Sequence, residues 1–369
     1  MIRSVRALVF RSPIETPVVT SFGTMRDRPM VLVRVEDHEG IVGWGETWCN
    51  FPTVGAEHRA RLIESVLAPL VEGKHFERPQ EAFRMLTAKT AVLAIQSGEP
   101  GPIAQAIAGL DIALWDLKAR RAGEPLWRML GGTSPRIPVY ASGINPDSPE
   151  KTAARKREEG YTAFKLKVGF GADRDVANLE ALRAELGSDV AIMVDANQGW
   201  SLAQAAEIVP RLQPFTLGWL EEPLRADSPW NDWQVLARRT GIPLAAGENI
   251  GSDEGFDAAL HAGALDVVQP DIAKWGGFSG CLSVAKRIRD AHLRFCPHYL
   301  GGGVGLLASA HLLAAVGGDG LLEVDANPNP LRTLTCGPLN RVAGGFATLD
   351  SQPGLGRFDL EPLAPFACA

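Results

Sequence analysis

The 369-residue sequence predicts an α/β protein in which a small α+β domain precedes a barrel of alternating strands and helices. The main observation is a series of polar residues, each ending a short apolar run and spaced 23 to 30 positions apart: Lys165, Asp195, Glu221, Glu248, Asp271, His298 and Glu323. One strand, one loop and one helix need about that much chain. A barrel that builds its active site at the carboxyl ends of its strands places charged side chains in this way.

The first 132 residues are expected to form the α+β domain. Residues 2–11 and Pro29–Glu36 alternate between apolar and polar side chains, as strands do. Asp37–Gly40 then turns the chain into a third strand at Ile41–Glu46. Helical patterns follow at Ala56–Pro69, Pro79–Val92 and Ile103–Arg121. Strands followed by helices, rather than alternating with them, are typical of an α+β domain.

Residues 133–338 are expected to form the barrel, because short strands and helices alternate there. Eight strands are predicted, at Val139–Ala141, Ala163–Val168, Ala191–Val194, Leu217–Glu221, Leu244–Gly247, Val267–Pro270, Arg294–Pro297 and Leu321–Val324. Eight such units favour a closed barrel over an open sheet, and no GxGxxG motif opens the first unit to suggest a dinucleotide site. The Gly- and Pro-rich segment 339–369 is expected to pack back on the first domain.

Composition and charge exclude several classes of protein. The net charge of −6 and the absence of a basic run argue against nucleic acid or an anionic membrane surface as a partner. No apolar run reaches the roughly 18 residues of a membrane span, and the first 13 residues lack the apolar stretch of a signal peptide. Five scattered cysteines without a CxxC pair favour reduced thiols and a cytoplasmic location.

Three carboxylates end successive predicted strands: Asp195 in VDANQ, Glu221 in WLEEP and Glu248 in AAGEN. At neighbouring strand ends their mutual repulsion would raise their pKa values strongly unless a divalent cation neutralised them. Ligands that are all oxygen favour Mg²⁺, with Mn²⁺ as a substitute, over zinc. The alternative is three unrelated carboxylates that cap helices. Glu222 and Asn249 are expected to support the ligands.

Two lysines, Lys165 and Lys167, stand two positions apart in one predicted strand, so both point to the same side. A KxK string is most often a solvated edge, but the flanking residues here are apolar, which argues against that interpretation. Two partly desolvated ammonium groups lower each other's pKa, so one lysine would be neutral enough to act as a base.

An aspartate and a histidine end the next two strands of the series. Asp271 could accept a hydrogen bond from the ring of His298, fix its tautomer and raise its basicity. Lys274 could add a further cation to the barrel mouth or only support it. Glu323, on the last strand, could donate a hydrogen bond to a substrate oxygen when protonated, or could orient a neighbour.

In this order KxK, DxN, EEP, GEN, PDxxKxGG and the late histidine resemble the mandelate racemase subgroup of the enolase superfamily. The string GLDIALWDLKARRAGEPLWRMLGG is similar to the segment through which that family enters its barrel. The resemblance implies an α+β capping domain, a modified TIM barrel written (β/α)7β, and a homo-oligomer. It also implies one Mg²⁺ per subunit, bound by Asp195, Glu221 and Glu248.

The resemblance further implies removal of the proton α to a substrate carboxylate, through an enediolate, as already described for enolase-superfamily sites. Lys167 would be one base, and His298 would be the base on the opposite face. Lys165 would contact the substrate carboxylate, and with the metal it would stabilise the enediolate. Asn197 would be a polar substrate contact, and Glu323 would be the electrophilic acid.

Three functions remain open. The two lysines with an Asp–His pair resemble members that dehydrate aldonic and aldaric sugar acids. A racemase, epimerase or cycloisomerase on a hydroxy acid or lactone would use the same two bases. Within that group the muconate cycloisomerase branch is kept open only by Lys274, because it typically relies on a lysine at the sixth strand without the histidine. The third function is Mg²⁺-dependent carboxylate binding without catalysis.

Substrate specificity is expected from the capping domain. The segment Thr16–Arg28 is interpreted as a loop that closes over the barrel mouth, with Arg26 meeting a distal polar group of the substrate. Trp48 would add aromatic surface to the same site. The alternative for this segment is an ordinary surface loop.

Overall fold

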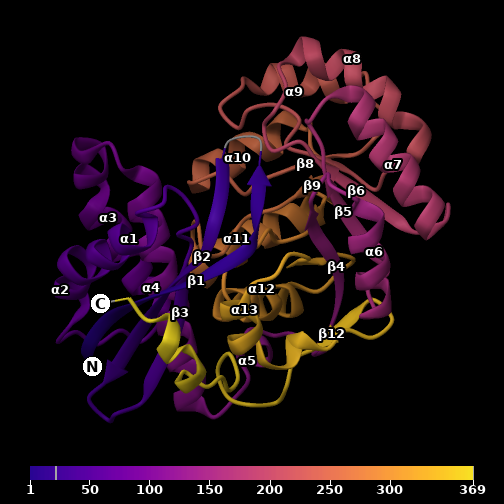
Figure 1. Ribbon diagram of the computed structural model, residues 1–369. Coiled ribbons are helices and arrows are strands. Elements are labelled where there is room, and N and C mark those ends of the chain that lie inside the picture. Colours follow the sequence, from indigo (N-terminus) through magenta and orange to yellow (C-terminus); the bar gives the residue numbers. More distant parts are fainter. Residues whose placement is uncertain (21–22, 369) are drawn as a thin grey trace.

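The computed structural model describes residues 1–20 and 23–368 of the chain. An N-terminal three-stranded antiparallel sheet with its helices lies beside a domain in which helices surround parallel strands (Figure 1). The predicted α+β capping domain and (β/α)7β barrel are therefore confirmed.

The capping domain begins with a sheet in the order β1-β2-β3. Its strands are β1 (Ile2–Thr20), β2 (Gly23–Asp37) and β3 (Val42–Thr47). Its helices are α1 (Gly55–Leu62), a π-helical turn (Ile63–Leu67), α2 (Ala68–Val71), α3 (Pro79–Ser97), α4 (Pro100–Ala122) and α5 (Leu126–Met129). The predicted strands and helices are all present, and each helix end differs from its prediction by only a few residues.

The β1–β2 hairpin is longer than predicted. The segment Thr16–Arg28 was interpreted as a loop, and this was wrong, because Val18 pairs with Met25 and Thr20 with Gly23 in the antiparallel ladder. The valine-rich sequence there favours extended backbone. Ser21 and Phe22 lie outside the described residues. Figure 1 shows the hairpin reaching from the capping domain toward the barrel.

Strand β3 and helix α4 approach each other at glycines. A Cβ atom on Gly43 would lie 2.3 Å from the carbonyl oxygen of Ala113, and one on Gly45 would lie 2.1 Å from that of Gly109. Only residues without a Cβ permit this separation. The strand and the helix therefore touch backbone to backbone.

The barrel strands run parallel in the order β11-β4-β5-β6-β7-β8-β9-β10. They are β4 (Arg136–Ile144), β5 (Ala163–Lys167), β6 (Ala191–Asp195), β7 (Leu220–Glu221), β8 (Leu244–Ala246), β9 (Val267–Val268), β10 (Arg294–Phe295) and β11 (Leu322–Asp325). The helices are α6 (Pro149–Glu158), α7 (Ala172–Leu186), α8 (Leu202–Leu212), α9 (Trp230–Ala237), α10 (Asp253–Ala262), α11 (Gly277–Asp290), α12 (Gly303–Val316) and α13 (Pro330–Thr335). All eight predicted strands are present, several of them shorter than expected.

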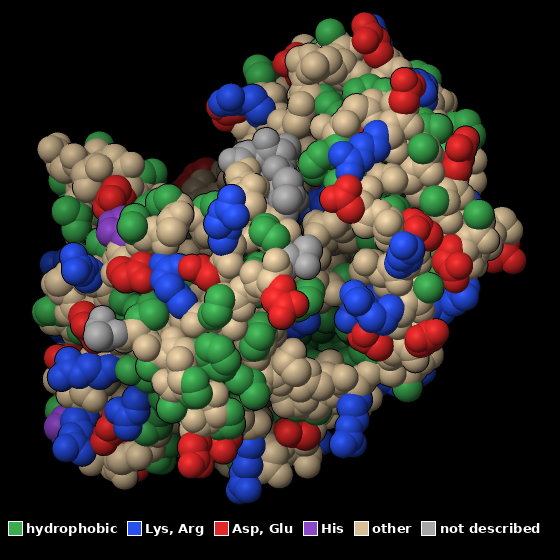
Figure 2. Space-filling view, in the orientation of Figure 1, with side chains coloured by type: hydrophobic (Ala, Val, Ile, Leu, Met, Phe, Trp, Pro, Cys, Tyr) green, Lys and Arg blue, Asp and Glu red, His purple; other side chains and the backbone are tan. Residues whose placement is uncertain are grey.

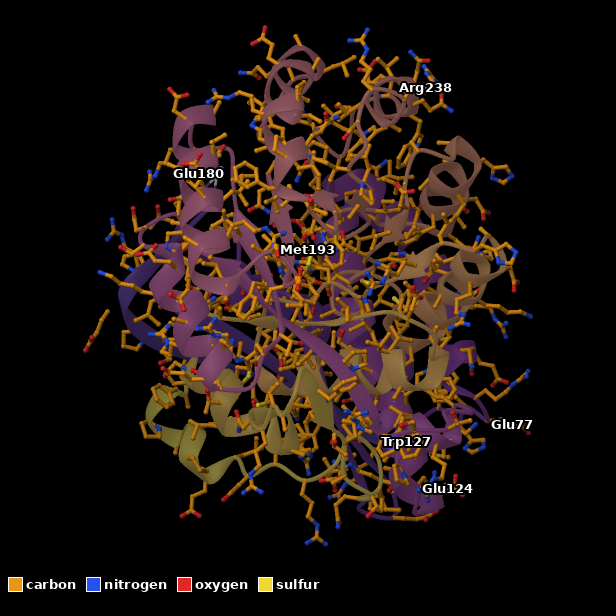
Figure 3. The ribbon with its side chains drawn as sticks, turned by 90° about the vertical axis from the view of Figure 1, so that its right-hand side faces the viewer. Glu77, Glu124, Trp127, Glu180, Met193 and Arg238 are labelled. Carbon is orange, nitrogen blue, oxygen red and sulfur yellow. The ribbon has the colours of Figure 1, made fainter. Side chains whose placement is uncertain are left out.

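Apolar side chains fill the interior of the barrel. Tyr140, Met193 and Trp219 are at most 1% exposed, and the Tyr140 and Trp219 rings meet edge to face with their centroids 5.4 Å apart. Met193 lies near the middle of the molecule, whereas Glu180 and Arg238 lie at its periphery (Figure 3). This part of the barrel interior is therefore a packed core.

The chain after Leu339 contacts both domains. Strand β12 (Phe346–Thr348) pairs antiparallel with β4. Further on, the Leu355 amide donates to the Asp116 carboxylate of α4, 2.6 Å away, and the Cys368 amide donates to the Val9 carbonyl, 2.9 Å away.

Surface and helix composition add two observations. Basic and acidic side chains are interspersed over the face shown in Figure 2. Within residues 1–20 and 23–368, none of the helices has the length and apolar character needed to cross a membrane. All five cysteines are free thiols.

Candidate active site

The barrel register brings the predicted residues of β5, β6 and β7 to one level. Lys167 pairs with Asp195, and Asp195 pairs with Glu221, in neighbouring parallel strands. Lys165 and Lys167 are both buried, and both ammonium groups meet carboxylates at this end of the barrel. Strand alternation thus places both lysines on the inner side, as the sequence predicted.

Lys167 lies between a carboxylate and an amide. Its Nζ is 2.7 Å from Asp195 Oδ2 and 2.6 Å from Asn197 Oδ1. Burial and the neighbouring Lys165 both lower the pKa of Lys167, but the attraction of Asp195 outweighs them and raises that pKa above its ordinary value. Lys165 does lower the pKa of Lys167, as predicted. This lowering is smaller than the increase caused by Asp195, so Lys167 is not neutral in this arrangement.

Lys165 is fully buried beneath Lys167. Its Nζ lies 2.5 Å from Glu221 Oε1 and 2.8 Å from Glu323 Oε1. Burial lowers the pKa of Lys165, yet attraction by Glu221 and Glu323 raises it well above the ordinary value. Lys165 therefore bridges two carboxylates inside the barrel.

The predicted Asp271–His298 pair is in contact. His298 Nδ1 lies 2.7 Å from Asp271 Oδ2, and Nε2 lies 2.7 Å from Glu248 Oε2. Asp271 Oδ1 accepts the amide hydrogen of Ala273 at 2.8 Å, which fixes the carboxylate. Burial lowers the pKa of His298, but attraction by Glu248 and by Glu323 raises it well above the ordinary value. The imidazole is therefore held at both nitrogens by carboxylates.

Lys274 and Trp48 meet over Glu248. Lys274 Nζ is 3.1 Å from Glu248 Oε2 and 4.7 Å from the centre of the Trp48 ring, a cation–π contact between the barrel and the capping domain.

Glu222 lies beside these residues, and Asn249 donates to it at 2.8 Å. Burial, and then repulsion from Glu248 and Asp195, raise the pKa of Glu222 well above its ordinary value. Negative charge is therefore in excess at this point.

Glu323 is ionised rather than protonated. Its carboxylate accepts hydrogen bonds from Ser142 Oγ and from the Tyr299 amide, the latter at 2.9 Å. Burial raises the pKa of Glu323, but Lys165 and His298 outweigh burial and lower it to about 2. These contacts support the predicted role of orienting a neighbour, and the role as an acid toward substrate stays a prediction.

The predicted metal ligands Asp195, Glu221 and Glu248 are each paired with a cationic side chain of the protein itself. Among the described residues, no group of three or more His, Cys, Asp or Glu side chains is arranged to hold a metal ion. The donor set nevertheless fits a hard cation, because it consists of carboxylate oxygens. The repulsion that raises the pKa of Glu222 marks the place where a divalent ion would relieve excess negative charge.

A cavity of about 200 Å³ lies between the capping domain and these residues. Its wall includes Trp48, Lys167, Asn197, Glu248, Lys274 and His298. Three residues that sequence reasoning did not assign, Asn50, Gln198 and Asn327, add amide groups to the wall. No local pattern in the sequence marks them, since they come from separate segments.

The two arginines of the predicted lid segment differ in their surroundings. Arg26 is exposed, and it is not among the described residues that line the cavity. Arg28 lines it instead, is 2% exposed, and binds Asp325 Oδ2 of strand β11 at 2.8 Å. The sequence shows two arginines in this segment but not which one has a buried partner about 300 residues away.

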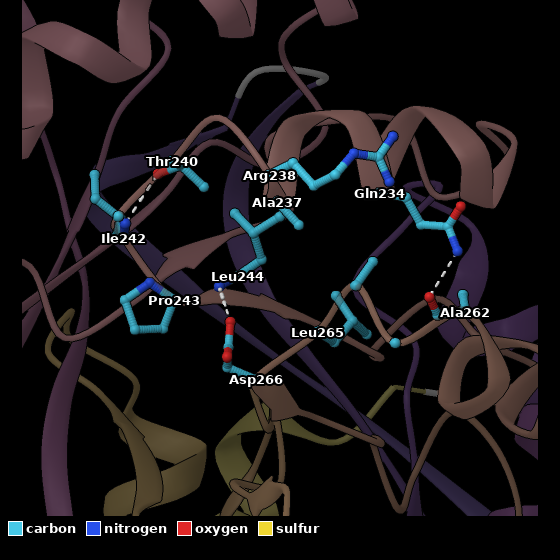
Figure 4. Close-up of a pocket in the computed structure, with 13 residues that line it drawn as sticks. Gln234, Ala237, Arg238, Thr240, Ile242, Pro243, Leu244, Ala262, Leu265 and Asp266 are labelled. Carbon is cyan, nitrogen blue, oxygen red and sulfur yellow. Dashed lines mark hydrogen bonds between the residues drawn. The ribbon is translucent and has the colours of Figure 1, made fainter.

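A larger cavity of about 460 Å³ lies at the other end of the barrel (Figure 4). It is lined by residues that precede strands β8 and β9, whereas active sites of such barrels lie at the opposite strand ends. Its polar groups bond to one another: the Leu244 amide donates to Asp266 at 2.9 Å, and Gln234 donates to the Ala262 carbonyl at 2.8 Å. This cavity therefore lacks the reactive groups of the first.

Family models match both parts of the chain. Residues 3–131 match the N-terminal domain of mandelate racemase and muconate lactonizing enzyme, and residues 149–358 match an enolase C-terminal domain-like model. A solved mandelate racemase/muconate lactonizing enzyme from Bordetella bronchiseptica is 58% identical, with a TM-score of 0.94 over 99% of both chains. An enolase from Bradyrhizobium, solved with magnesium and mandelic acid, is 31% identical, with a TM-score of 0.88 over 100% of this chain and 98% of its own.

Characterised relatives differ in their reactions. A 3,6-anhydro-α-L-galactonate cycloisomerase from Streptomyces coelicolor is 32% identical over 100% of this chain and 99% of its own. A D-galactarolactone cycloisomerase from Agrobacterium fabrum is 31% identical over 96% of this chain and 95% of its own. A D-galactonate dehydratase from Klebsiella pneumoniae is 31% identical over 80% of this chain and 78% of its own.

Proposed function

Because the chain belongs to the mandelate racemase/muconate lactonizing enzyme family of the enolase superfamily, we propose that it removes the proton α to the carboxylate of a sugar acid and then expels a β-hydroxyl as water. The observation that carries this proposal is the pairing of two proton-transfer groups in one cavity. Lys167 and His298 both line it, and a carboxylate orients each of them.

The residues divide the proton transfers between them. Asp195 and Asn197 hold Lys167 Nζ, and attraction by Asp195 keeps it protonated in this arrangement. With Asp195 bound to Mg²⁺ that attraction would fall, and the neutral amine would take the α-proton. Asp271 binds Nδ1 of His298, and Nε2 pairs with Glu248 in this structure. With Glu248 bound to Mg²⁺, Nε2 would give a proton to the departing hydroxyl or to the opposite face of the substrate. Because these two groups sit on separate strands of one cavity wall, they can act on different faces of a bound substrate.

Asp195, Glu221 and Glu248 would hold Mg²⁺, which when bound stabilises the negative charge that develops on the substrate carboxylate. Lys165 is buried below the cavity wall, so we assign it a supporting role: it fixes Glu221 and Glu323 from beneath. This differs from the direct substrate contact that the sequence suggested.

The substrate is proposed to be a polyhydroxy acid. Amide side chains of Asn50, Asn197, Gln198 and Asn327 line the cavity and can exchange hydrogen bonds with several hydroxyl groups. Relatives at about 30% identity act on galactonate and its derivatives, and a solved relative holds mandelic acid. A homo-oligomeric state and a cytoplasmic location stay predictions.

Cycloisomerisation of a sugar-acid lactone is the second candidate. The observation in its favour is coverage: the two cycloisomerases match 96% and 100% of this chain, whereas the D-galactonate dehydratase matches 80% of it. The same two proton-transfer groups would serve, with the ring oxygen in place of the hydroxyl as leaving group.

A screen separates the candidates. Aldonic acids, aldaric acids and their lactones would be incubated with the Mg²⁺-loaded protein, 2-keto acids detected with semicarbazide, and isomerised products detected by proton NMR. Both eliminations give a 2-keto acid, so mass spectrometry of the product decides between them. A 2-keto acid that is one water lighter than its substrate supports dehydration. A ring-opened 2-keto acid with the same mass as its lactone substrate supports the second candidate, and α-deuterium in D₂O with neither product indicates a racemase. Ligand binding without α-exchange would overturn both proposals.

A further inference from the structure

We propose that Glu46, on strand β3 of the capping domain, is a positioning residue that holds the loop carrying His298. This inference rests on the proposed role of His298 in proton transfer. Glu46 is 2% exposed and lies outside the cavity wall, so its effect would pass through the loop rather than through the substrate.

The carboxylate of Glu46 gathers three hydrogen bonds from one loop. Oε1 accepts the Tyr299 hydroxyl at 2.6 Å and the Gly302 amide at 2.5 Å, and Oε2 accepts the Gly305 amide at 2.8 Å. The last two amides lie at the N-terminus of α12, where a negative charge is favourable. Burial raises the pKa of Glu46 to about 6, and the bonds from Tyr299, Gly305 and Gly302 oppose that rise.

Tyr299 connects this carboxylate to the proton-transfer group. It directly follows His298, and its own amide donates to Glu323 Oε2 at 2.9 Å. The backbone beside the imidazole is therefore held from the barrel by Glu323 and from the capping domain by Glu46. Displacement of Tyr299 would move His298 relative to the substrate.

Glycines allow the loop to come this close. A Cβ atom on Gly302 would lie 2.7 Å from Glu46 Oε1, and one on Gly305 would lie 2.1 Å from the Tyr299 hydroxyl. The run GGGVG after Leu300 thus has a physical reason, since side chains there would push the loop away from Glu46.

The rest of the same capping segment holds both halves of the Asp271–His298 pair. Two residues beyond Glu46, the Trp48 amide donates to the Ala273 carbonyl at 3.2 Å, close behind Asp271. Asn50 donates to the Leu300 carbonyl at 2.7 Å, close behind His298. The segment is therefore tied to each of the two loops from which the pair projects.

The test compares Glu46→Gln and Tyr299→Phe with Asp116→Asn as the matched control. Glutamine has the size of Glu46, but its NH₂ group would face a hydrogen-bond donor of the loop, so at least one of the three bonds is lost. Phenylalanine removes only the bond from the Tyr299 hydroxyl. Asp116 is an equally buried carboxylate of the capping domain, and its described partners are Trp44, Arg120 and Leu355, remote from the loop in sequence.

The first readout needs no substrate. Ring-labelled histidine NMR of the full chain resolves seven imidazoles, and the His298→Asn variant assigns the signal of interest. The His298 signals are expected to shift and broaden in Glu46→Gln and, less, in Tyr299→Phe, and to stay in place in Asp116→Asn. Unchanged His298 signals in both loop variants, or equal shifts in the control, would overturn the inference.

The second readout follows α-proton exchange in D₂O with D-galactonate and its C2 epimer D-talonate, which present opposite faces. Exchange on the His298 face is expected to fall on the order of 10- to 100-fold in Glu46→Gln, while exchange on the Lys167 face changes less than about 2-fold. An equal loss on both faces would contradict a positioning role. Absence of exchange in the wild type would count against the proposed function on these acids and leave the NMR result as the test of Glu46.

Discussion

Buried carboxylates serve two regions of this molecule in different ways. At the barrel mouth they face cationic side chains, as Asp195 faces Lys167. At the seam between the domains they face backbone amides at helix N-termini: Glu46 binds the start of α12, and Asp111 of α4 accepts the Ser279 amide of α11 at 3.0 Å. A side-chain cation can move or lose its proton, whereas a backbone amide can do neither. The mouth can therefore change charge, and the seam fixes geometry.

The two buried histidines repeat this contrast. At the mouth, carboxylates raise the pKa of His298 well above its ordinary value despite burial. At the seam, burial lowers the pKa of His311 to about 3, and its Nδ1 accepts the Trp127 amide at 2.9 Å. The same side chain thus has its pKa raised in one region and lowered in the other.

The largest effect is expected from removing a proton-transfer group at the mouth. Lys167→Ala and His298→Asn should each lower turnover of the substrate found in the screen by about 10²- to 10⁴-fold, because each loses one of the two proton transfers. Each variant should still exchange α-deuterium through the surviving group, measured by mass spectrometry and NMR. Lys151→Ala, on the exposed side of α6, is the control. Full activity in either variant would contradict proton transfer by both Lys167 and His298.

The next largest effect is expected from the binding of Mg²⁺ to the carboxylates at the barrel mouth. EDTA should abolish activity and Mg²⁺ should restore it. Saturating Mg²⁺ should also raise the free energy of unfolding by about 3 kcal/mol at a hundredfold excess over Kd, since only the folded chain offers the site. Calorimetry checks this. Asp195→Asn should lose the stabilisation and the seam variant Asp116→Asn should keep it; stabilisation that persists in Asp195→Asn would place the ion elsewhere.

At the seam, a change of charge should alter stability and spare the chemistry. Asp111→Asn should lower the free energy of unfolding by about 1–3 kcal/mol, because an amide donor replaces an acceptor opposite the Ser279 amide and hydroxyl. Urea unfolding measures the loss, and the exposed Asp173→Asn serves as the control. A fall in kcat as large as that of Lys167→Ala, without loss of stability, would contradict the division between the regions.

The smallest effect is a pH dependence of stability. His311 binds a proton in the unfolded chain below its ordinary pKa of 6.5, but in the folded chain only near pH 3. The folded state is therefore penalised as pH falls from 6.5 toward 3, by about 1 kcal/mol between pH 7 and 5.5. Measured against His311→Gln at the same pH, the wild type should lose this much free energy of unfolding between pH 7 and 5.5, because buried carboxyl groups with raised pKa values, such as Glu46, contribute equally to both proteins. The exposed His261→Gln should behave as the wild type does.

Sequence reasoning reached the fold because evenly spaced polar residues mark seven of the eight predicted barrel strands, and the remaining strand, Val139–Ala141, precedes them in the same alternation of strands and helices. It also placed Lys167, Asp195, His298 and Asp271 at the strand ends. It could not give the length of strands such as β7, Leu220–Glu221, because that depends on the neighbouring strands.

Other features depend on contacts between distant segments. Arg28 rather than Arg26 lines the cavity because Arg28 binds the buried Asp325. The ionised state of Glu323 follows from Lys165 and His298. Glu46 carried no local signal, since the loop that it binds lies about 250 residues further along the chain.

The glycine contact between β3 and α4 restricts how this enzyme can be redesigned. Since Gly43 and Gly45 bring strand and helix into backbone contact, the two move as one rigid frame. That frame carries Glu46 on the strand and Asp111 on the helix, so a mutant library that reshapes β3 would also disturb the contacts that hold the N-termini of α12 and α11. Val18 and Met25 reach the cavity from the β1–β2 hairpin, outside that contact. New substrate preferences should be sought there first.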